Sequence, residues 1–468
     1  MSVAIKSSRL FNYEDPYYEG FVFSLIIGWL PFKLMAYIAP FLFVLWFILR
    51  SRSGSTLIRT VLIVLIFLFF LFFYSVLYSF SSEKFIIQNA FLSFLTYGSF
   101  LIFLVLPNKV GNPKSISKYF RLIKLVILVE SFLGIVQVVL FTLTAGVNFD
   151  LSTGDVVQGS LNPLSFLNPG GNFNNQIYTC NLIMLLIFYV PYAISNKRNL
   201  WVCFIGVVAI LLASVWHLLI AIVLAMAIIF FFFKRTYIVY SKKFVLAGLF
   251  SLCIFSLTII IQPKNFSLIS HYYSKIQNFE SPKAIVAHSS LTQLPKEYPF
   301  VFIVGLGPGQ YESRAGLIGT GKYFGDFSNP TKLPVLVARS SKAFDQYIYP
   351  KWYEVATNPD QYGNSTMSRP FFSMLSIIIE FGFLFFVLLI VLVGIEIFGL
   401  RKIGLSSSNL LGRFYSFSCA IVIVFLAIIS LFENYLEVAH AIFVGLLLLK
   451  YFLGYTKNNI QHQTNTNG

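Results

Sequence analysis

The side chains suited to polar chemistry gather in one hydrophilic segment, from about Pro263 to Pro370, between long apolar runs. This segment carries eleven Lys or Arg residues against seven Asp or Glu residues, and it is rich in Tyr. Lys and Arg bind phosphate, and aromatic faces stack on sugar rings. The composition therefore suits an anionic, lipid-linked ligand that contains sugars, and an ordinary solvated loop is the alternative.

A glycine-rich run stands inside this segment, at Gly305-Leu306-Gly307-Pro308-Gly309 after an apolar stretch that begins at Pro299. Glycines allow backbone amides to approach a ligand closely, as they do in anion-binding turns. The run is not the dinucleotide fingerprint, which needs Gly-x-Gly-x-x-Gly at the start of a helix in a βαβ unit. Gly305, Gly307 and Gly309 are thus candidate ligand-binding residues, and a structural turn is the alternative.

Several asparagines lie directly before the apolar run Ile177–Ile194, in the stretch from Asn168 to Gln176. Their side-chain amides can hydrogen-bond sugar hydroxyls, which makes Asn168, Asn172 and Asn175 candidates for substrate binding. The alternative is a turn at the entry of a helix, with an asparagine as its cap.

Two polar residues lie within apolar stretches. His217, near Ser214, is a candidate functional residue because ionisable groups are rare inside membranes, although at an interfacial turn it can also simply contact water. Glu130 should face the interior of a helix bundle, since its exposure to lipid costs about 2.5 kcal/mol or more. A structural hydrogen bond is the expected role of Glu130.

The overall composition indicates a polytopic membrane protein. Hydrophobic residues make up 57% of the 468 residues and charged residues only 11%, whereas about a quarter of a soluble domain is charged. The net charge of +16 comes largely from clusters at the ends of apolar runs, where basic residues fix orientation rather than bind nucleic acid. All four cysteines lie in apolar runs, so neither a disulfide framework nor a cysteine metal site is expected.

A single span needs about 20 apolar residues. Eight runs meet this length: Leu57–Phe80, Phe85–Leu106, Tyr119–Leu143, Ile177–Ile194, Phe244–Ile261, Phe371–Ile397, Phe414–Leu431 and Val438–Leu453. Gly20–Leu49 is predicted to form two short helices that meet near Pro31. Leu200–Phe233 is predicted to form a hairpin with its tip near Ser214–His217, because basic pairs flank both of its ends.

These runs predict an all-α membrane protein with about twelve transmembrane helices (11–12). Basic connectors alternate with poorly charged ones, which puts the long polar segment outside the cell membrane and the C-terminus in the cytoplasm. We expect three parts: an N-terminal bundle at 1–262, a large outer loop at 263–370, and C-terminal helices with a short tail at 371–468.

Four short motifs occur in the order found in one superfamily. Asn168 to Asn175 resembles an Arg-x-x-Gly-x-Phe…Asn motif, with Asn168 in place of Arg. Ser214 to His217 resembles a hairpin tip with Ser-Arg, and Lys283 lies where an Arg precedes the glycine-rich run. Ser368-Arg369-Pro370-Phe371, followed by Glu380-Phe381-Gly382, resembles the last motif. The chain thereby resembles the O-antigen polymerase (Wzy) and O-antigen ligase (WaaL) superfamily of bacterial envelope glycosyltransferases.

This resemblance implies a GT-C-like inner-membrane enzyme with a large periplasmic loop and no cofactor or metal. Its donor and acceptor would be glycans linked to undecaprenyl pyrophosphate, with membrane lipids and a chain-length regulator protein as further partners. Polymerisation of repeat units is the expected reaction; transfer of polymer to lipid A-core and flipping of the lipid-linked units are the alternatives.

The resemblance also implies roles for individual residues. An inverting transfer needs cations around the leaving pyrophosphate and a base at the acceptor hydroxyl. Arg369, Lys283 and Arg314 would surround the pyrophosphate, with His217 at the rim. His288 would be the base, and Glu312 is its rival.

Overall fold

The computed structural model describes residues 16–29, 33–51, 54–80, 83–107, 116–145, 153–167, 173–237, 256, 270–271, 273–322, 336–357, 369–407 and 410–466. Asn168, Asn172 and, apart from Ser256, the predicted span Phe244–Ile261 lie outside these residues. Within the described ranges every regular element is a helix, which confirms the all-α class.

Eight helical segments are long and apolar enough to cross a membrane. Their elements are α3 (Gly54–Ser79), α4 (Ile87–Thr96) with η1 (Tyr97–Phe100) and α5 (Leu101–Val105), α6 (Ile116–Ala145), α7 (Asn174–Ser195), α9 (Trp216–Tyr237), α19 (Phe383–Ser406), α20 (Leu410–Ile429) and α21 (Ala439–Thr466). The chain is therefore a polytopic membrane protein by the length and composition of its helices.

Shorter apolar helices occupy the two regions that were predicted to be interrupted. α1 (Pro16–Gly28) and α2 (Lys33–Ser51) lie on either side of Pro31. α8 (Leu200–Ala213) ends at Ser214, whose φ of 51° is left-handed, and α9 begins two residues later. Both predicted interruptions are confirmed.

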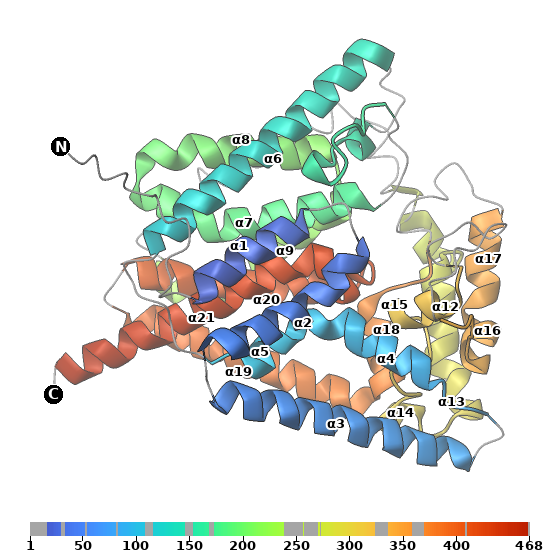
Figure 1. Cartoon of the computed structure of the whole chain (residues 1–468). Helices are drawn as coiled ribbons and strands as arrows, with labels where there is room; N and C mark the ends of the chain where they lie inside the picture. Colours follow the sequence, from blue (N-terminus) through green and yellow to red (C-terminus); the bar gives the residue numbers. More distant parts are fainter. Residues whose placement is uncertain are drawn as a thin grey trace, which may run out of the picture.

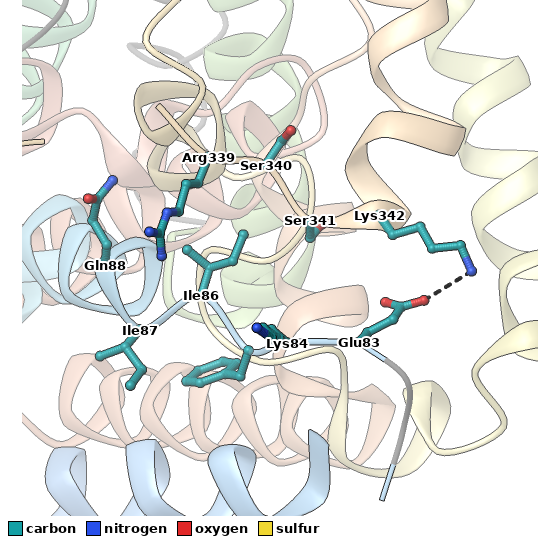
Figure 2. A pocket seen from close by; sticks show the side chains of 10 residues that line it. Glu83, Lys84, Ile86, Ile87, Gln88, Arg339, Ser340, Ser341 and Lys342 are labelled. Carbon is teal, nitrogen blue, oxygen red and sulfur yellow. Dashed lines mark ion pairs between the residues drawn. The ribbon is translucent and has the colours of Figure 1, made fainter. Parts of the chain in front are cut away.

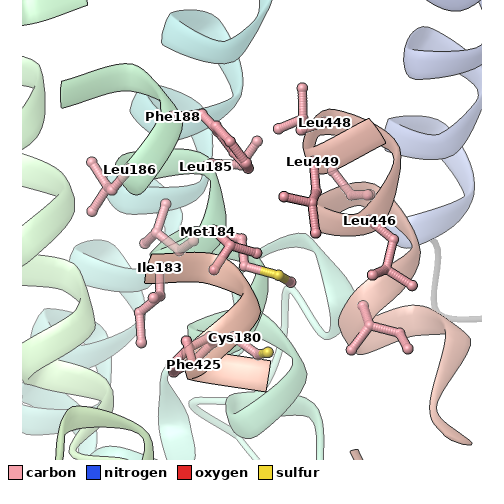
Figure 3. Close-up of a cluster of buried hydrophobic side chains, with 14 of the residues drawn as sticks. Cys180, Ile183, Met184, Leu185, Leu186, Phe188, Phe425, Leu446, Leu448 and Leu449 are labelled. Carbon is pink, nitrogen blue, oxygen red and sulfur yellow. The ribbon is translucent and has the colours of Figure 1, made fainter. Parts of the chain in front are cut away.

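The centre of the bundle is apolar and is formed by α7, α20 and α21 (Figure 3). Most residues in these three helices are buried, whereas only 6% of those in the apolar windows of α3 and α19 are. A Cβ on Gly445 would lie 2.0 Å from Sδ of Met184, so the small residue lets α21 approach α7 closely. The exposed apolar faces of α3 and α19 suit contact with lipid.

Glu130 is buried in α6, as its sequence context predicts. Its carboxylate accepts hydrogen bonds from the backbone amide of Ser160 at 2.9 Å and from the Ser160 hydroxyl at 2.7 Å. The predicted structural role of this carboxylate is confirmed.

A small helical unit, which we call the cap, stands at one end of the bundle (Figure 1). It comprises the described residues from Pro282 to Phe381, whose helices are α12 (Pro282–Thr292), α13 (Leu294–Glu297), α14 (Val301–Val304), α15 (Arg314–Gly319), α16 (Lys342–Tyr347), α17 (Tyr349–Thr357) and α18 (Ser373–Phe381). The cap has its own apolar core, which includes Val286, Tyr311, Phe344, Trp352 and Ile379. In Figure 1 the C-terminal end of α21 lies at the opposite end of the bundle.

The predicted single span Phe371–Ile397 is wrong. Gly382, with a φ of 87°, separates α18 from α19. Phe371, Leu375 and Ile379 pack into the core of the cap, so only α19 continues as a membrane-length helix. The core of the cap therefore extends beyond residue 370, where the outer loop was expected to end.

Candidate functional site

The glycine-rich run of the cap is hydrogen-bonded to the C-terminal end of α18. The amides of Leu306 and Gly307 donate to the carbonyls of Ile379 and Glu380 at 2.8 and 2.9 Å. A Cβ on Gly305 would lie 2.4 Å from the Glu380 carbonyl oxygen, and a Cβ on Gly382 would lie 2.4 Å from that of Ile303. Two of the motifs noted in the sequence therefore meet backbone to backbone, which only glycine permits here.

The side chain of Glu380 organises the next few residues. Its carboxylate is fully buried and accepts hydrogen bonds from the amides of Gly309 at 2.6 Å, Tyr311 at 2.9 Å and Ser313 at 3.2 Å. Burial raises the pKa of Glu380 to about 7, and these hydrogen bonds act against that rise.

These contacts correct the expectation for the glycines. The amides of Gly305, Gly307 and Gly309 all donate to groups within the protein, so they are not available to bind an anionic ligand. The positive φ values of the three glycines, 78°, 97° and 72°, serve the close packing of this run.

The segment held by Glu380 carries Glu312, one of the two candidate bases. Glu312 is fully buried, and no side chain among the described residues donates a hydrogen bond to its carboxylate, although the backbone amide of Phe372 acts on it. Burial raises the pKa of Glu312 well above its usual value, the charge of Lys283 opposes the rise, and the charge of Glu437 adds to it.

Lys283 is the cation whose charge acts on the pKa of Glu312. It is the second residue of α12, only 9% exposed, and its ammonium group donates to the carbonyl of Phe371. Burial lowers the pKa of Lys283, while Glu433 and Glu312 oppose that change. The ammonium also lies 5.7 Å from the ring centre of Phe372.

Arg314 begins α15 two residues after Glu312. Its backbone amide donates to the carboxylate of Glu437, and its guanidinium lies 5.3 Å from the ring centre of Phe173 at the start of α7. Burial raises the pKa of Glu437 to about 8, with the charge of Glu380 as a further cause. The five residues Lys283, Glu312, Arg314, Glu433 and Glu437 form what we call the junction cluster, at the contact between cap and bundle.

The turn between α20 and α21 supplies the bundle side of this cluster. The Asn434 side chain donates to the Glu312 carbonyl at 3.1 Å, and the amide of Ser373 donates to the Glu433 carbonyl at 3.4 Å. From the sequence we predicted only an outer connector here. Two glutamates within five residues, in a chain with only 18 Asp and Glu residues, are the signal that could have identified the turn.

His217 joins the same turn from α9. Its Nε2 lies 2.6 Å from the hydroxyl of Tyr435, which in turn donates to the side-chain oxygen of Gln176 at 3.1 Å. His217 is therefore at the edge of the junction cluster, where a rim position was expected.

Asn175 and Arg369 have different surroundings. The Asn175 amide donates to Asp155 at 3.0 Å, a contact that fixes the entry of α7. Arg369 is partly exposed just before α18, and its positive charge acts on Lys283.

His288, the first candidate base, lies away from the cluster. It is exposed, and its ring meets that of Phe279 edge to face with centroids 5.6 Å apart. Since it follows Lys283 by five residues in the same helix, it lies on a different side of α12. The structure thus brings Lys283, Glu312 and Arg314 together, and it does not bring His288 to them.

The junction cluster combines a buried carboxylate that receives no side-chain hydrogen bond among the described residues with a buried ammonium group. Such a carboxylate is a stronger base than one in water, and the nearby cations can stabilise developing negative charge.

Comparison of the chain with models of known protein families, with curated proteins and with solved structures finds no match.

Proposed function

We propose that this protein is a polymerase of O-antigen or another surface polysaccharide, which joins repeat units linked to undecaprenyl pyrophosphate. The observation that carries this proposal is Glu312, a fully buried carboxylate that receives no side-chain hydrogen bond among the described residues. It lies beside Lys283, where a polar cap meets a membrane bundle. The order of the four sequence motifs supports the same reaction.

In this proposal Glu312 is the general base. The acceptor hydroxyl attacks the anomeric carbon of the donor as Glu312 removes its proton. The bond between that carbon and the phosphate oxygen breaks, and lipid pyrophosphate leaves with the electron pair. The configuration at the anomeric carbon is inverted, and no nucleotide sugar takes part.

Cations around the leaving group complete the proposed site. Lys283 and Arg314 line the junction cluster, and Arg369 stands at the entry of α18, where its charge acts on Lys283. Their positive charges would stabilise the pyrophosphate in the transition state. Glu312 replaces His288 as the proposed base, because His288 is exposed on another side of α12.

We infer a location in the bacterial inner membrane, with about twelve spans, a GT-C-like arrangement, a periplasmic cap and a cytoplasmic C-terminus. The eight long helices and the shorter α1, α2 and α8 support this count. Phe244–Ile261, outside the described residues apart from Ser256, would be the remaining span.

The test is complementation of a strain that lacks the gene, with the surface polysaccharide separated on a gel. Glu312→Gln should lower chain extension about 100-fold or more, because it removes the base, and Arg369→Ala should also abolish the ladder. Single repeat units should remain on lipid A-core. Glu297→Gln is the matched control, since Glu297 is exposed on the cap, where it bonds Gln346 and Tyr347 and no member of the junction cluster among the described residues.

Immunoblots must give equal protein levels for all variants. A wild-type ladder from Glu312→Gln would exclude the proposed base. In the gene deletion, loss of all glycan from lipid A-core with polymer still on its lipid carrier would identify a ligase. Repeat units retained on the cytoplasmic side would identify a flippase.

A further inference from the structure

Two neighbouring cavities lie at the surface of the cap, and the first of them opens toward the start of α4. The first has a volume of 570 Å³ and lies between residues 83–88 and residues 339–342 (Figure 2). The second has a volume of 380 Å³, and its lining includes Lys322, Phe344 and Tyr349. Because Arg339 and Ser340 line both cavities, we treat them as one groove with two lobes.

The groove has an excess of positive charge. Its lining contains Lys84, Arg339, Lys342 and Lys322 against two carboxylates. Glu83 already binds Lys342 at 3.3 Å and the Tyr298 hydroxyl at 2.6 Å. Asp345 accepts a hydrogen bond from Ser340 at 2.6 Å.

Lys84 and Arg339 are the cations available to a ligand. Both are exposed. Their side chains form no hydrogen bond or ion pair within the part of the chain that the structure describes. A guanidinium group binds a carboxylate through two parallel hydrogen bonds, so Arg339, between the two lobes, is well suited to an anionic group.

Aromatic rings accompany these cations. Phe85 lines the first lobe and Tyr349 the second. The Tyr349 hydroxyl accepts a hydrogen bond from Lys322 at 2.7 Å, and this contact fixes the ring at the wall of the groove. Rings beside polar and charged groups suit a sugar, whose apolar face stacks while its hydroxyls remain hydrogen-bonded.

Gln310 links the groove to the segment that carries Glu312. Gln310 exchanges hydrogen bonds with the backbone of Ile86 at 3.1 and 3.0 Å, and its carbonyl accepts one from the Ser341 hydroxyl. Ile86 and Ser341 line the first lobe, and Gln310 precedes Glu312 by two residues. The wall of the groove is therefore hydrogen-bonded to the segment of the buried carboxylate.

We propose that this groove binds an acidic oligosaccharide, with a sugar carboxylate held by Arg339 and Lys84. Its part in the reaction, as the subsite for the acceptor or the growing chain, rests on the proposed polymerase function. Binding itself can be measured without turnover.

The test uses the full-length protein in detergent and titration calorimetry with two soluble probes. Trigalacturonate carries three carboxylates, and maltotriose is a neutral trisaccharide. We expect trigalacturonate to bind and maltotriose to bind at least tenfold more weakly. Arg339→Gln should weaken trigalacturonate binding about tenfold or more, since a hydrogen bond to a charged group is lost, and Arg339→Lys should keep part of it.

Lys296→Gln is the matched control, because Lys296 is an exposed cation of the cap outside the groove and should leave binding unchanged. Equal binding of the two probes, or unchanged binding by Arg339→Gln, would overturn the proposal. So would displacement of trigalacturonate by short-chain phosphatidylglycerol at equal concentration, which would identify a lipid headgroup site. Binding is measured on the purified protein without turnover and polymerisation is measured from the ladder in cells, so failure of the polymerase proposal and failure of the groove proposal give different results.

Discussion

The centre of the bundle and the junction below the cap are both buried, but they are held together differently. α7, α20 and α21 meet through apolar side chains and small residues, with Gly445 against Met184. At the junction, the amide of Arg314 donates to Glu437 and the Asn434 side chain donates to the Glu312 carbonyl. Within the cap, the Glu380 carboxylate accepts from three buried amides and holds the segment that carries Glu312 and Arg314. The apolar centre depends on the fit of its side chains, whereas a buried polar group loses stability whenever its hydrogen-bond partner is removed. Of these two regions, the junction is the one with ionisable groups that could take part in proton transfer.

The largest loss of stability is expected from Glu380→Ala. Three buried amides would lose their acceptor, and the change should destabilise the protein by about 3 kcal/mol or more, because each buried donor left unpaired costs about 1–3 kcal/mol. Thermal unfolding in detergent measures this, with Glu354→Ala on exposed α17 as the control. Equal unfolding midpoints for the two variants would contradict the role given to Glu380.

Gly305→Ala should have the next largest effect. The new Cβ would meet the Glu380 carbonyl oxygen at 2.4 Å, at a φ of 78° that disfavours alanine. A cost of about 1–3 kcal/mol is expected from the backbone conformation alone. The measurement is again thermal unfolding, and a midpoint like that of the wild type would show that the run can move away from α18.

The pH dependence of stability tests the buried carboxylates. Since the pKa of Glu437 is about 8 in the folded protein and 4.5 in a model compound, the folded state retains a proton that the unfolded state releases between these values. Stability should be greatest below about pH 4.5, fall as the pH rises to about 8, and then level off. The midpoint of unfolding from pH 5 to 9 should fall less steeply in Glu437→Gln, and parallel curves would refute this assignment.

The smallest effects on stability are expected when either of two glycines in the bundle is replaced by alanine. Gly445→Ala forces Met184 to move and should cost about 1 kcal/mol, at the low end for overpacking because the thioether is flexible. Gly394→Ala in α19 meets no atom within 4 Å and should be neutral or stabilising by up to about 1 kcal/mol. If the two variants unfold at the same temperature, then α7 and α21 do not need a glycine at position 445 to pack together.

Local sequence patterns predicted much of the fold. The interruptions near Pro31 and Ser214 are confirmed, as is the buried hydrogen-bonding role of Glu130. Phe371–Ile397 was misjudged because a continuous apolar run does not reveal that its first part packs into the cap instead of crossing a membrane.

The candidate site was predicted less completely. Lys283, Glu312 and Arg314 were selected from the sequence and lie together in the structure. The glycine run was assigned to a ligand, yet its amides bind within the protein. Glu433 and Glu437 were missed, because nothing in a short connector indicates which distant residues it will contact.

By itself, the sequence determined that this is a helical membrane protein with one polar unit outside its bundle, because hydropathy and helix interruptions act over a few neighbouring residues. Only the tertiary structure decided that Glu380 holds the segment around Glu312, across 71 residues from Gly309, and that Glu437 reaches Arg314 across 123. Buried charges meet through long-range packing, and that packing also determined which carboxylate receives no side-chain hydrogen bond among the described residues.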